Sequence, residues 1–509
     1  MKREALRSPL AIFLFVLVAK AGILLLAGTR YGFMSDELYF LDAAARPALG
    51  YLDFPPLLPW LMALLGWFEL NALFVLRALA AAVGALVVCV SVDLCRILGG
   101  RTWACWLVAL VFLFAPGFLS VQSILTMNVL DQFWWAAALW LAARHLQTRR
   151  AHFMLLLGLV LGLGVLTKLS ILALCAALPL AWLLWERDIF RAASTWFAAL
   201  LACGLIAPFI AWQVANDWPF LEFISAYNST PPNALVLRSP ALGLVLTMNP
   251  GYAVIWGVGA VYTFFSPDRV MKILGTAVWL CLGLYLWAGV KFYFAVPAFG
   301  FFSIAGALFW QQQLAAGRPA WRGALMGLAA SGVLAVPGAA PVLPEARLQQ
   351  LARFLRDSEQ AYPGREAADL ERYFPHFAEM HGWPELVDLV AKEWEQLPPA
   401  RREGAVLMAS HYGQAGALNQ LDGSHRLPQA YSRHMSYHLW SEGLAYEQGL
   451  FVGFDSAELL PLFETVEELA RFDCQGCMAR ERGLELYYVA NPRLPADQLR
   501  DRLHRYDFF

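Results

Sequence analysis

The sequence predicts a mainly α-helical membrane protein that crosses the bilayer many times and carries a smaller soluble α/β domain at its C-terminus. Three observations lead to this fold class. The 509 residues are 59% hydrophobic and only 15% charged, whereas soluble domains are about 45–50% apolar and about 25% charged. The apolar residues are concentrated before residue 340 or so. The formal net charge is −1, which gives no support to a nucleic-acid partner.

Long apolar runs define the membrane part, because a transmembrane helix needs about 17–25 such residues. They predict about eleven spans within residues 1–340, which we interpret as one transmembrane domain. The first run lacks a small-residue cleavage site, which favours an uncleaved anchor over a secretory signal. The runs are 9–28, 71–95, 102–120, 128–146, 151–166, 168–185, 193–213, 242–264, 271–289, 292–311 and 322–340.

The basic residues of the short loops predict the orientation, because Lys and Arg favour the cytoplasmic side. With eleven spans, every such cluster falls on the side of the N-terminus. We therefore expect a cytoplasmic N-terminus in a bacterial inner membrane, with residues 341–509 in the periplasm beside loops 29–70 and 214–241. The basic residues are Lys2, Arg3, Arg7, Arg96, Arg101, Arg144, Arg149, Arg150, Arg187, Arg191, Arg269, Lys272, Arg318 and Arg322.

The loop 29–70 combines acids with a second apolar stretch. Asp36 and Glu37 closely follow the first span, and Asp53 precedes two prolines. Residues 57–70 are apolar and contain Trp, which predicts a helix lying along the membrane interface. The three acids then lie near the outer membrane surface. Ordinary solvated loop acids, or caps of the following helix, are the alternative interpretation.

The stretch YGFMSDELYFLDAAARPALGYLDFPPLLPWL resembles the first outer loop of membrane glycosyltransferases with the GT-C fold. The similarity is to the protein O-mannosyltransferase and aminoarabinose transferase-like family, in its acidic pair and its G-Y-x-D-x-P-P-L motif at residues 50–57. GLGVLTKLSILAL, around Lys168, and GVKFYFAVPAF, around Lys291 and Tyr293, resemble two further segments of that family. A phenylalanine replaces one aromatic residue of the usual tyrosine pair in the second.

The C-terminal part also resembles this family. FAEMHGWPELVDLVAKEWEQLPP and SHYGQAGALN are similar to the soluble domain of bacterial members. Those members commonly have an acid where Gln414 stands here, so the resemblance assigns no role to this position.

The resemblance implies that a sugar is transferred from a polyprenyl-phosphate donor, such as undecaprenyl phosphate, to an acceptor at the outer leaflet. A carboxylate near the anomeric carbon can accept the proton of the nucleophile and stabilise developing positive charge. We expect Asp36 to be the base of a single inverting displacement, with Glu37 as the second catalytic acid and with Asp53 and Tyr51 binding substrate. These acids also have the chemistry to hold a divalent cation, although the resemblance implies no metal.

The leaving phosphate requires positive charge at the same level of the membrane. Lys168 and Lys291 lie at outer span ends, and Arg77 lies in the first turns of the second span. Ionisable residues in spans tend to mark substrate paths, and cations pair strongly with phosphate. Snorkelling of long side chains is the alternative. Tyr293 is either a hydrogen-bond donor to the phosphate or an interfacial belt residue.

Asn128 and Asp131 begin the fourth span at its outer end. Asp131 has the position to contact the sugar, but both residue types also cap helices.

Residues 341–509 read as a small α/β domain. Strand-like runs at 405–410, 450–454 and 484–490 alternate with helix-like runs at 384–396 and 456–471. His434 and His438 have the i, i+4 spacing of helical metal ligands, but packing histidines are the favoured interpretation. Cys474 and Cys477 form a C-x-x-C motif on the oxidising side, where a disulfide is favoured over a metal half-site or a redox motif.

Three functions follow from these features. We favour transfer to an outer-leaflet glycolipid, such as a lipopolysaccharide component, or to an envelope polysaccharide, because the C-terminal part resembles bacterial members. A protein O-glycosyltransferase is the alternative. A lipid or sugar transporter without catalysis is less favoured, because no internal repeat is apparent.

Overall fold

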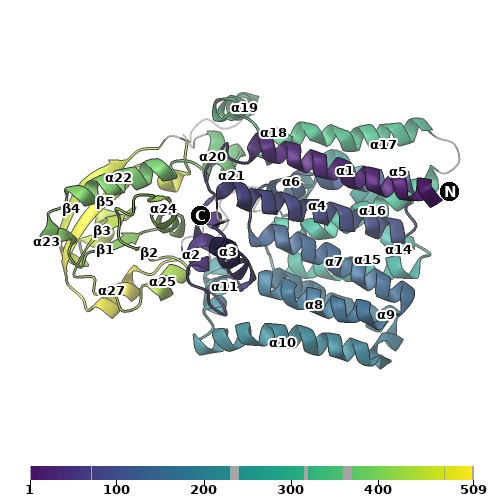
Figure 1. The fold of residues 1–509 in the computed structure, drawn as a ribbon, viewed down its shortest axis with the longest axis horizontal. Helices are drawn as coiled ribbons and strands as arrows, with labels where there is room; N and C mark the ends of the chain where they lie inside the picture. Colours follow the sequence, from purple (N-terminus) through teal and green to yellow (C-terminus); the bar gives the residue numbers. More distant parts are fainter. Residues whose placement is uncertain are drawn as a thin grey trace.

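The computed structural model describes residues 2–69, 72–229, 240–314, 319–358, 369–474 and 476–506. A bundle of long, side-by-side helices forms one part, and a mixed α/β unit formed by the C-terminal residues lies at one end of that bundle (Figure 1). The protein is thus a mainly helical, multi-pass membrane protein with a small C-terminal sheet domain.

Each predicted span contains at least one helix. Among the described residues, 6 helices are long and apolar enough to cross a membrane, and the number of crossings stays a prediction. The bundle consists of α1 (Lys2–Ala27), α4 (Leu73–Ile97), α5 (Thr102–Phe114), α6 (Pro116–Val121), α7 (Met127–Thr148), α8 (Ala151–Thr167), α9 (Leu172–Trp185), α10 (Ala193–Ala215), α13 (Pro240–Thr247), α14 (Ala253–Phe265), α15 (Arg269–Trp287), α16 (Val296–Gln313), α17 (Pro319–Ser331) and α18 (Val336–Ala339).

Three of the apolar runs form two helices rather than one, and proline explains two of the breaks. Proline lacks an N–H and disfavours a helical conformation for the residue before it. Ala115 is accordingly extended before Pro116, between α5 and α6. Asn249 has a positive φ of 62° before Pro250, between α13 and α14. In the third run, a short 3-10 turn separates α17 from α18.

Three short helices lie outside the bundle, near its end next to the C-terminal domain: α2 (Ser35–Ala44), α3 (Leu57–Trp67) and α11 (Pro219–Ser229). The side chain of Trp67 is 84% exposed at the end of α3 and is followed by the exposed Phe68. Large exposed apolar groups suit a helix at the membrane interface. By contrast, α2 is almost entirely buried.

The C-terminal domain is built on a five-stranded sheet of order β2-β1-β3-β5-β4. Strands β2 and β3 pair with β1 in parallel, and β5 pairs antiparallel with both β3 and β4. The strands are β1 (Val406–Ala409), β2 (Ala430–Ser432), β3 (Gln448–Val452), β4 (Phe463–Phe472) and β5 (Leu484–Pro492). The helices are α19 (Glu345–Ser358), α20 (Asp369–Tyr373), α21 (Pro375–Ala378), α22 (Trp383–Gln396), α23 (Pro399–Arg402), α24 (Tyr412–Leu421), α25 (Ser436–Trp440), α26 (Ser456–Leu459) and α27 (Ala496–Leu503).

The predicted helix at 456–471 is wrong. Only its first turn is helical, as α26, and residues 463–472 form the edge strand β4. Its sequence is rich in Glu, Leu and Ala, which favour helices, but pairing with β5 overrides that weak preference. Charged residues such as Glu467 and Arg471 suit an edge strand, because they discourage pairing with other chains.

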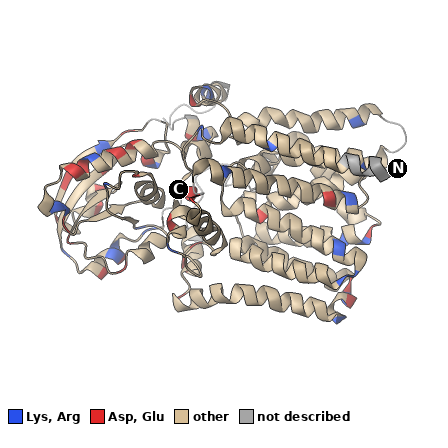
Figure 2. Ribbon diagram, in the orientation of Figure 1, with Lys and Arg blue, Asp and Glu red and all other residues tan. Residues whose placement is uncertain are grey.

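The basic loops gather at one end of the bundle. Figure 2 shows Lys and Arg at the helix ends that face away from the C-terminal domain. Glu186 lies 2.9 Å from Arg149 and 3.0 Å from Arg269, so three loops meet there. This arrangement agrees with a single basic side of the membrane.

An apolar core joins the C-terminal domain to the acidic loop 29–70. Leu38 and Phe54 of that loop share one buried cluster with Trp383, Leu418 and Leu450 of the domain. The domain is therefore packed on the acidic loop rather than tethered beside it.

Candidate functional site

Asp36 lies in the first turn of α2, where the partial positive charge of the helix N-terminus favours a carboxylate. Its side chain is partly exposed. The hydroxyl of Tyr412, at the start of α24, donates a hydrogen bond of 2.8 Å to Asp36 Oδ1. The predicted base thus lies at the junction of the acidic loop 29–70 and the C-terminal domain.

Glu37 points away from this junction and is completely buried. Its carboxylate accepts hydrogen bonds from the backbone N–H groups of Met34 (3.0 Å) and Leu125 (3.2 Å). Arg77 Nη2 lies 3.8 Å from the same carboxylate and 2.6 Å from the carbonyl oxygen of Gly32. These contacts cap α2 and brace the loop, so Glu37 and Arg77 fill structural positions behind Asp36.

Asp53 is coupled to a second tyrosine. Its Oδ1 accepts a hydrogen bond of 2.7 Å from Tyr39, whose oxygen in turn accepts from the Ser436 N–H at 2.9 Å. Burial raises the pKa of Asp53 to about 7; the nearby Asp36 adds to this rise and the Tyr39 hydrogen bond opposes it. Tyr51 is buried and donates to the carbonyl oxygen of Ala43 at 2.8 Å, so its contacts hold the loop.

Glu379, which sequence reasoning missed, lies near Asp36, and Arg480, also missed, contacts Glu379. Glu379 accepts hydrogen bonds from Ser35 (3.3 Å) and from Arg480 (3.3 Å). Burial raises the pKa of Glu379, Arg480 opposes the rise, and Asp36 adds to it. Glu379 lies in the stretch FAEMHGWPELVDLVAKEWEQLPP that resembles the family, but no motif marks either residue for the site, because only tertiary packing brings Glu379 close to Asp36.

A cationic and aromatic cluster faces the same end of the bundle. Lys168 Nζ donates to Asn128 Oδ1 at 2.7 Å and lies 3.7 Å from the ring centroid of Phe294. Asp131 accepts from Ser170 at 3.4 Å and interacts electrostatically with Lys168. Asn128 and Asp131 do not cap α7, since that position is taken by Thr126.

Tyr293 connects the cationic cluster to the acids. Its ring centroid lies 5.0 Å from Lys168 Nζ, and the residue interacts electrostatically with both Asp36 and Glu379. Lys291 Nζ lies 5.2 Å from the ring centroid of Tyr227 on α11 and interacts electrostatically with Lys168. The structure therefore brings six of the predicted residues together: Asp36, Asp53, Asp131, Lys168, Lys291 and Tyr293. Glu37, Tyr51 and Arg77 instead hold the backbone of the loop in place.

The remaining predicted residues lie in the C-terminal domain. His434 precedes α25 and its ring lies 5.0 Å from that of His411, whereas His438 stacks on His504 at 3.8 Å. The two histidines thus do not share one helix face. Cys474 and Cys477 form a disulfide. Within the described residues, no group of three His, Cys, Asp or Glu side chains is arranged to hold a metal ion.

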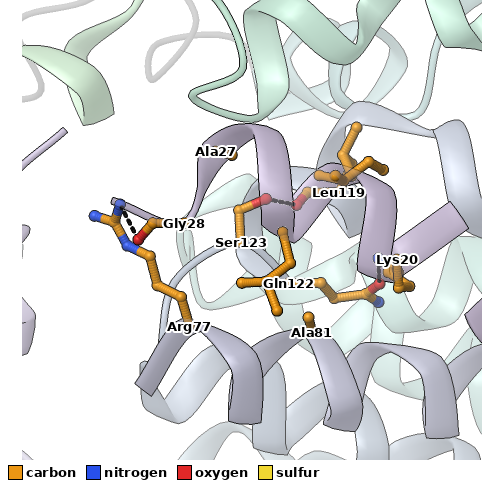
Figure 3. Close-up of a pocket in the computed structure, with 10 residues that line it drawn as sticks. Lys20, Ala27, Gly28, Arg77, Ala81, Leu119, Gln122 and Ser123 are labelled. Carbon is orange, nitrogen blue, oxygen red and sulfur yellow. Dashed lines mark hydrogen bonds between the residues drawn. The ribbon is translucent and has the colours of Figure 1, made fainter. Parts of the chain in front are cut away.

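A small cavity, lined in part by Arg77, lies between α1, α4 and α6 (Figure 3). Its volume is about 20 Å³, enough for a single water molecule. Lys20 lines it and donates to Gln122 Oε1 at 2.6 Å. The cavity is too small for a sugar or a phosphate and is not lined by Asp36.

The comparisons with known proteins agree with this architecture. Residues 53–212 match the dolichyl-phosphate-mannose-protein mannosyltransferase family. No curated protein matches the sequence. The structure is similar to that of ArnT from Cupriavidus metallidurans bound to undecaprenyl phosphate, with a TM-score of 0.60, 15% sequence identity, and coverage of 93% of this chain and 97% of that chain. It is similar to the apo state of the same ArnT with a TM-score of 0.60, 14% identity and the same coverage, 93% and 97%. The chain is therefore a membrane protein with the GT-C fold, similar to protein O-mannosyltransferases and ArnT.

Proposed function

We propose that this protein is a glycosyltransferase that moves a sugar from a polyprenyl-phosphate donor to an acceptor outside the cytoplasm. The observation that carries this proposal is the pairing of a partly exposed carboxylate, Asp36, with a cationic cluster at the same end of the bundle. A sugar phosphate needs both: negative charge beside the anomeric carbon and positive charge beside the leaving phosphate.

The chemistry is a single displacement. The acceptor hydroxyl gives its proton to Asp36 while its oxygen forms a bond to the anomeric carbon. The bond from that carbon to the phosphate oxygen breaks at the same time, and the polyprenyl phosphate leaves with the electron pair. The configuration at the anomeric carbon is therefore inverted.

The other site residues stabilise charge in this step. An ammonium group has three donors, so Lys168 keeps donors for phosphate while one bonds Asn128. Lys291 and the hydroxyl of Tyr293 supply further charge and a further hydrogen bond. Asp53 and Asp131 carry the polar groups that can bind sugar hydroxyls. A divalent cation is not needed in this scheme.

The donor assignment rests on likeness. The similar ArnT structure contains undecaprenyl phosphate, and its fold is shared over nearly the whole chain. We propose that this protein uses the same class of lipid, in a bacterial inner membrane with the C-terminal domain in the periplasm. The acceptor is then an outer-leaflet glycolipid or an envelope polysaccharide.

A protein acceptor is the second candidate. The match of residues 53–212 to the dolichyl-phosphate-mannose-protein mannosyltransferase family favours it. The two candidates share Asp36 and the donor site, and differ only in the labelled product.

The test is sugar transfer by purified protein from a panel of radiolabelled polyprenyl-phosphate sugars to cell-envelope fractions, with and without a chelator. We expect Asp36→Asn to lower the rate about 100-fold or more, the range of general-base catalysis, while donor lipid still binds. Asp188→Asn is the matched control, because Asp188 is 72% exposed at the opposite end of the bundle. Equal rates for wild type and D36N would contradict the role of Asp36. Absence of both transfer and donor binding would contradict the glycosyltransferase itself.

A further inference from the structure

Tyr412 makes a direct contact with Asp36 from a distant part of the chain. Its hydroxyl donates to Asp36 Oδ1 at 2.8 Å across a separation of 376 residues. We propose that Tyr412 is a positioning residue for Asp36, so that the C-terminal domain completes the catalytic site. This inference rests on the proposed function, in which Asp36 is the base. It gives a role to the C-terminal domain, which takes no part in the reaction scheme above.

Tyr412 is held in place on several sides. Its ring centroid lies 5.0 Å from that of Tyr39, 4.1 Å from that of His411 and 5.3 Å from that of His434. Burial raises the pKa of Tyr412 well above its usual value, and the charge of Asp36 adds to the rise. The phenol therefore keeps its proton at neutral pH and acts as a fixed donor rather than as an acid or base.

The packing of α24 on α2 sets the distance between the two residues. A methyl group on Gly413 would lie 2.8 Å from Ser35 Cβ, and one on Gly416 would lie 2.9 Å from Leu38 Cβ. Only glycine permits this close approach of the two helices. The first turn of α24 thus brings Tyr412 directly to the first turn of α2.

The hydrogen bond has a specific consequence for a base. It occupies Oδ1 and leaves Oδ2 of Asp36 to accept the proton of the acceptor. Removing the hydroxyl therefore releases Oδ1 from its fixed orientation, so that Oδ2 is less often aligned with the acceptor and proton transfer slows.

Other charged groups face this pair and act on it in every variant tested. Asp53, Glu379 and Tyr293 interact with Asp36, and Glu379, Arg480 and Asp36 interact with Tyr412. His411 and His434, which contact the Tyr412 ring, both have pKa values lowered by burial. Both imidazoles are therefore neutral at the pH of the transfer assay. A variant that changes only the Tyr412 hydroxyl leaves all these groups in place.

The chain offers a matched control for a lost phenol. Tyr437, also in the C-terminal domain, donates at 2.6 Å to Asp42 Oδ2 on the same helix α2. Asp42 is buried and also accepts hydrogen bonds from Asn419 and Gln420. Tyr437→Phe therefore removes the same kind of bond between the same two parts of the protein, but away from Asp36.

The experiment measures kcat and KM for wild type, Tyr412→Phe and Tyr437→Phe at neutral pH, with thermal unfolding of each. We expect Y412F to lower kcat about tenfold, with KM for the donor within about twofold of wild type, because the base is misplaced while donor binding is kept. We expect Y437F to lower the unfolding temperature and to leave kcat within about twofold of wild type. A kcat of Y412F equal to that of wild type would overturn the inference, as would equal losses of kcat in both variants.

A second readout separates this inference from the proposed function. Infrared difference spectra identify the carboxylate band of Asp36, since D36N lacks it, and report its hydrogen bonding without turnover. If wild type transfers no sugar, the proposed function fails, yet a change in the frequency of this band in Y412F, and not in Y437F, still supports the Tyr412 contact. An unchanged band in Y412F would overturn the contact whether or not the enzyme is active.

Discussion

Two adjacent acids in the motif have different environments. Successive residues of a helix point about 100° apart, so Asp36 faces Tyr412 while Glu37 faces the buried Arg77. The first is partly exposed and the second has no exposed surface. The motif predicts catalytic roles for both acids, whereas the direction of α2 gives only Asp36 an exposed surface.

At the residue scale, the pKa of Asp53, about 7, predicts how the stability of the protein depends on pH. The carboxyl group of an unfolded aspartate titrates near about pH 4. Between these values the folded protein keeps a proton that the unfolded chain has lost. The free energy of unfolding therefore falls as pH rises from about 4 to about 7, and this contribution is constant above that.

Asp53→Asn removes this dependence. We expect the difference in unfolding temperature, variant minus wild type, to increase by a few degrees as pH rises from about 4 to about 7. Above about pH 7 the difference stays constant. Thermal unfolding in detergent over this range measures it. The D188N variant, changed at an exposed site, is the control. A difference between D53N and wild type that does not vary with pH would contradict the raised pKa.

At the scale of elements, the contact between α2 and α24 depends on two glycines. Gly416→Ala places a methyl group 2.9 Å from Leu38 Cβ, so one helix must move. We expect a loss of about 1–3 kcal/mol in the free energy of unfolding, typical of overpacking, together with reduced transfer. Gly423→Ala is the control, because a methyl group there meets no atom within 4 Å. Equal stability of the two variants would show that the helices are not packed this closely.

The sequence predicts helices better than it predicts the strand β4. Apolar runs of membrane length leave few alternatives to a helix, since backbone groups in lipid must be hydrogen-bonded within the segment. Each predicted span accordingly contains a helix, and α22 and three of the strands lie where they are expected. Residues 463–472 lie outside lipid, so this requirement does not apply to them. Their pairing with β5 is a contact between distant parts of the sequence, which local helix propensity cannot predict.

For the whole molecule, the sequence predicts the half of the site that lies in the bundle and outer loop. Asp36, Lys168, Lys291 and Tyr293 stand next to recognisable motifs and span ends. Tyr412 and Glu379 stand more than 340 residues after Asp36, in a domain whose placement is set by apolar packing on the first outer loop. Both lie in stretches that resemble the family, but their place beside Asp36 follows only once the two parts are placed together.

The charge distribution of the whole molecule predicts its orientation. Figure 2 shows basic residues at the bundle end away from the C-terminal domain, and basic loops favour the cytoplasm. We expect alkaline phosphatase fused after Phe509 to be active and green fluorescent protein fused there to be dark. Fusions after Arg150, in a basic loop, are expected to behave in the opposite way. A fluorescent C-terminal fusion would place Asp36 and Lys291 at the cytoplasmic surface, and an acceptor in the outer leaflet would then be out of reach.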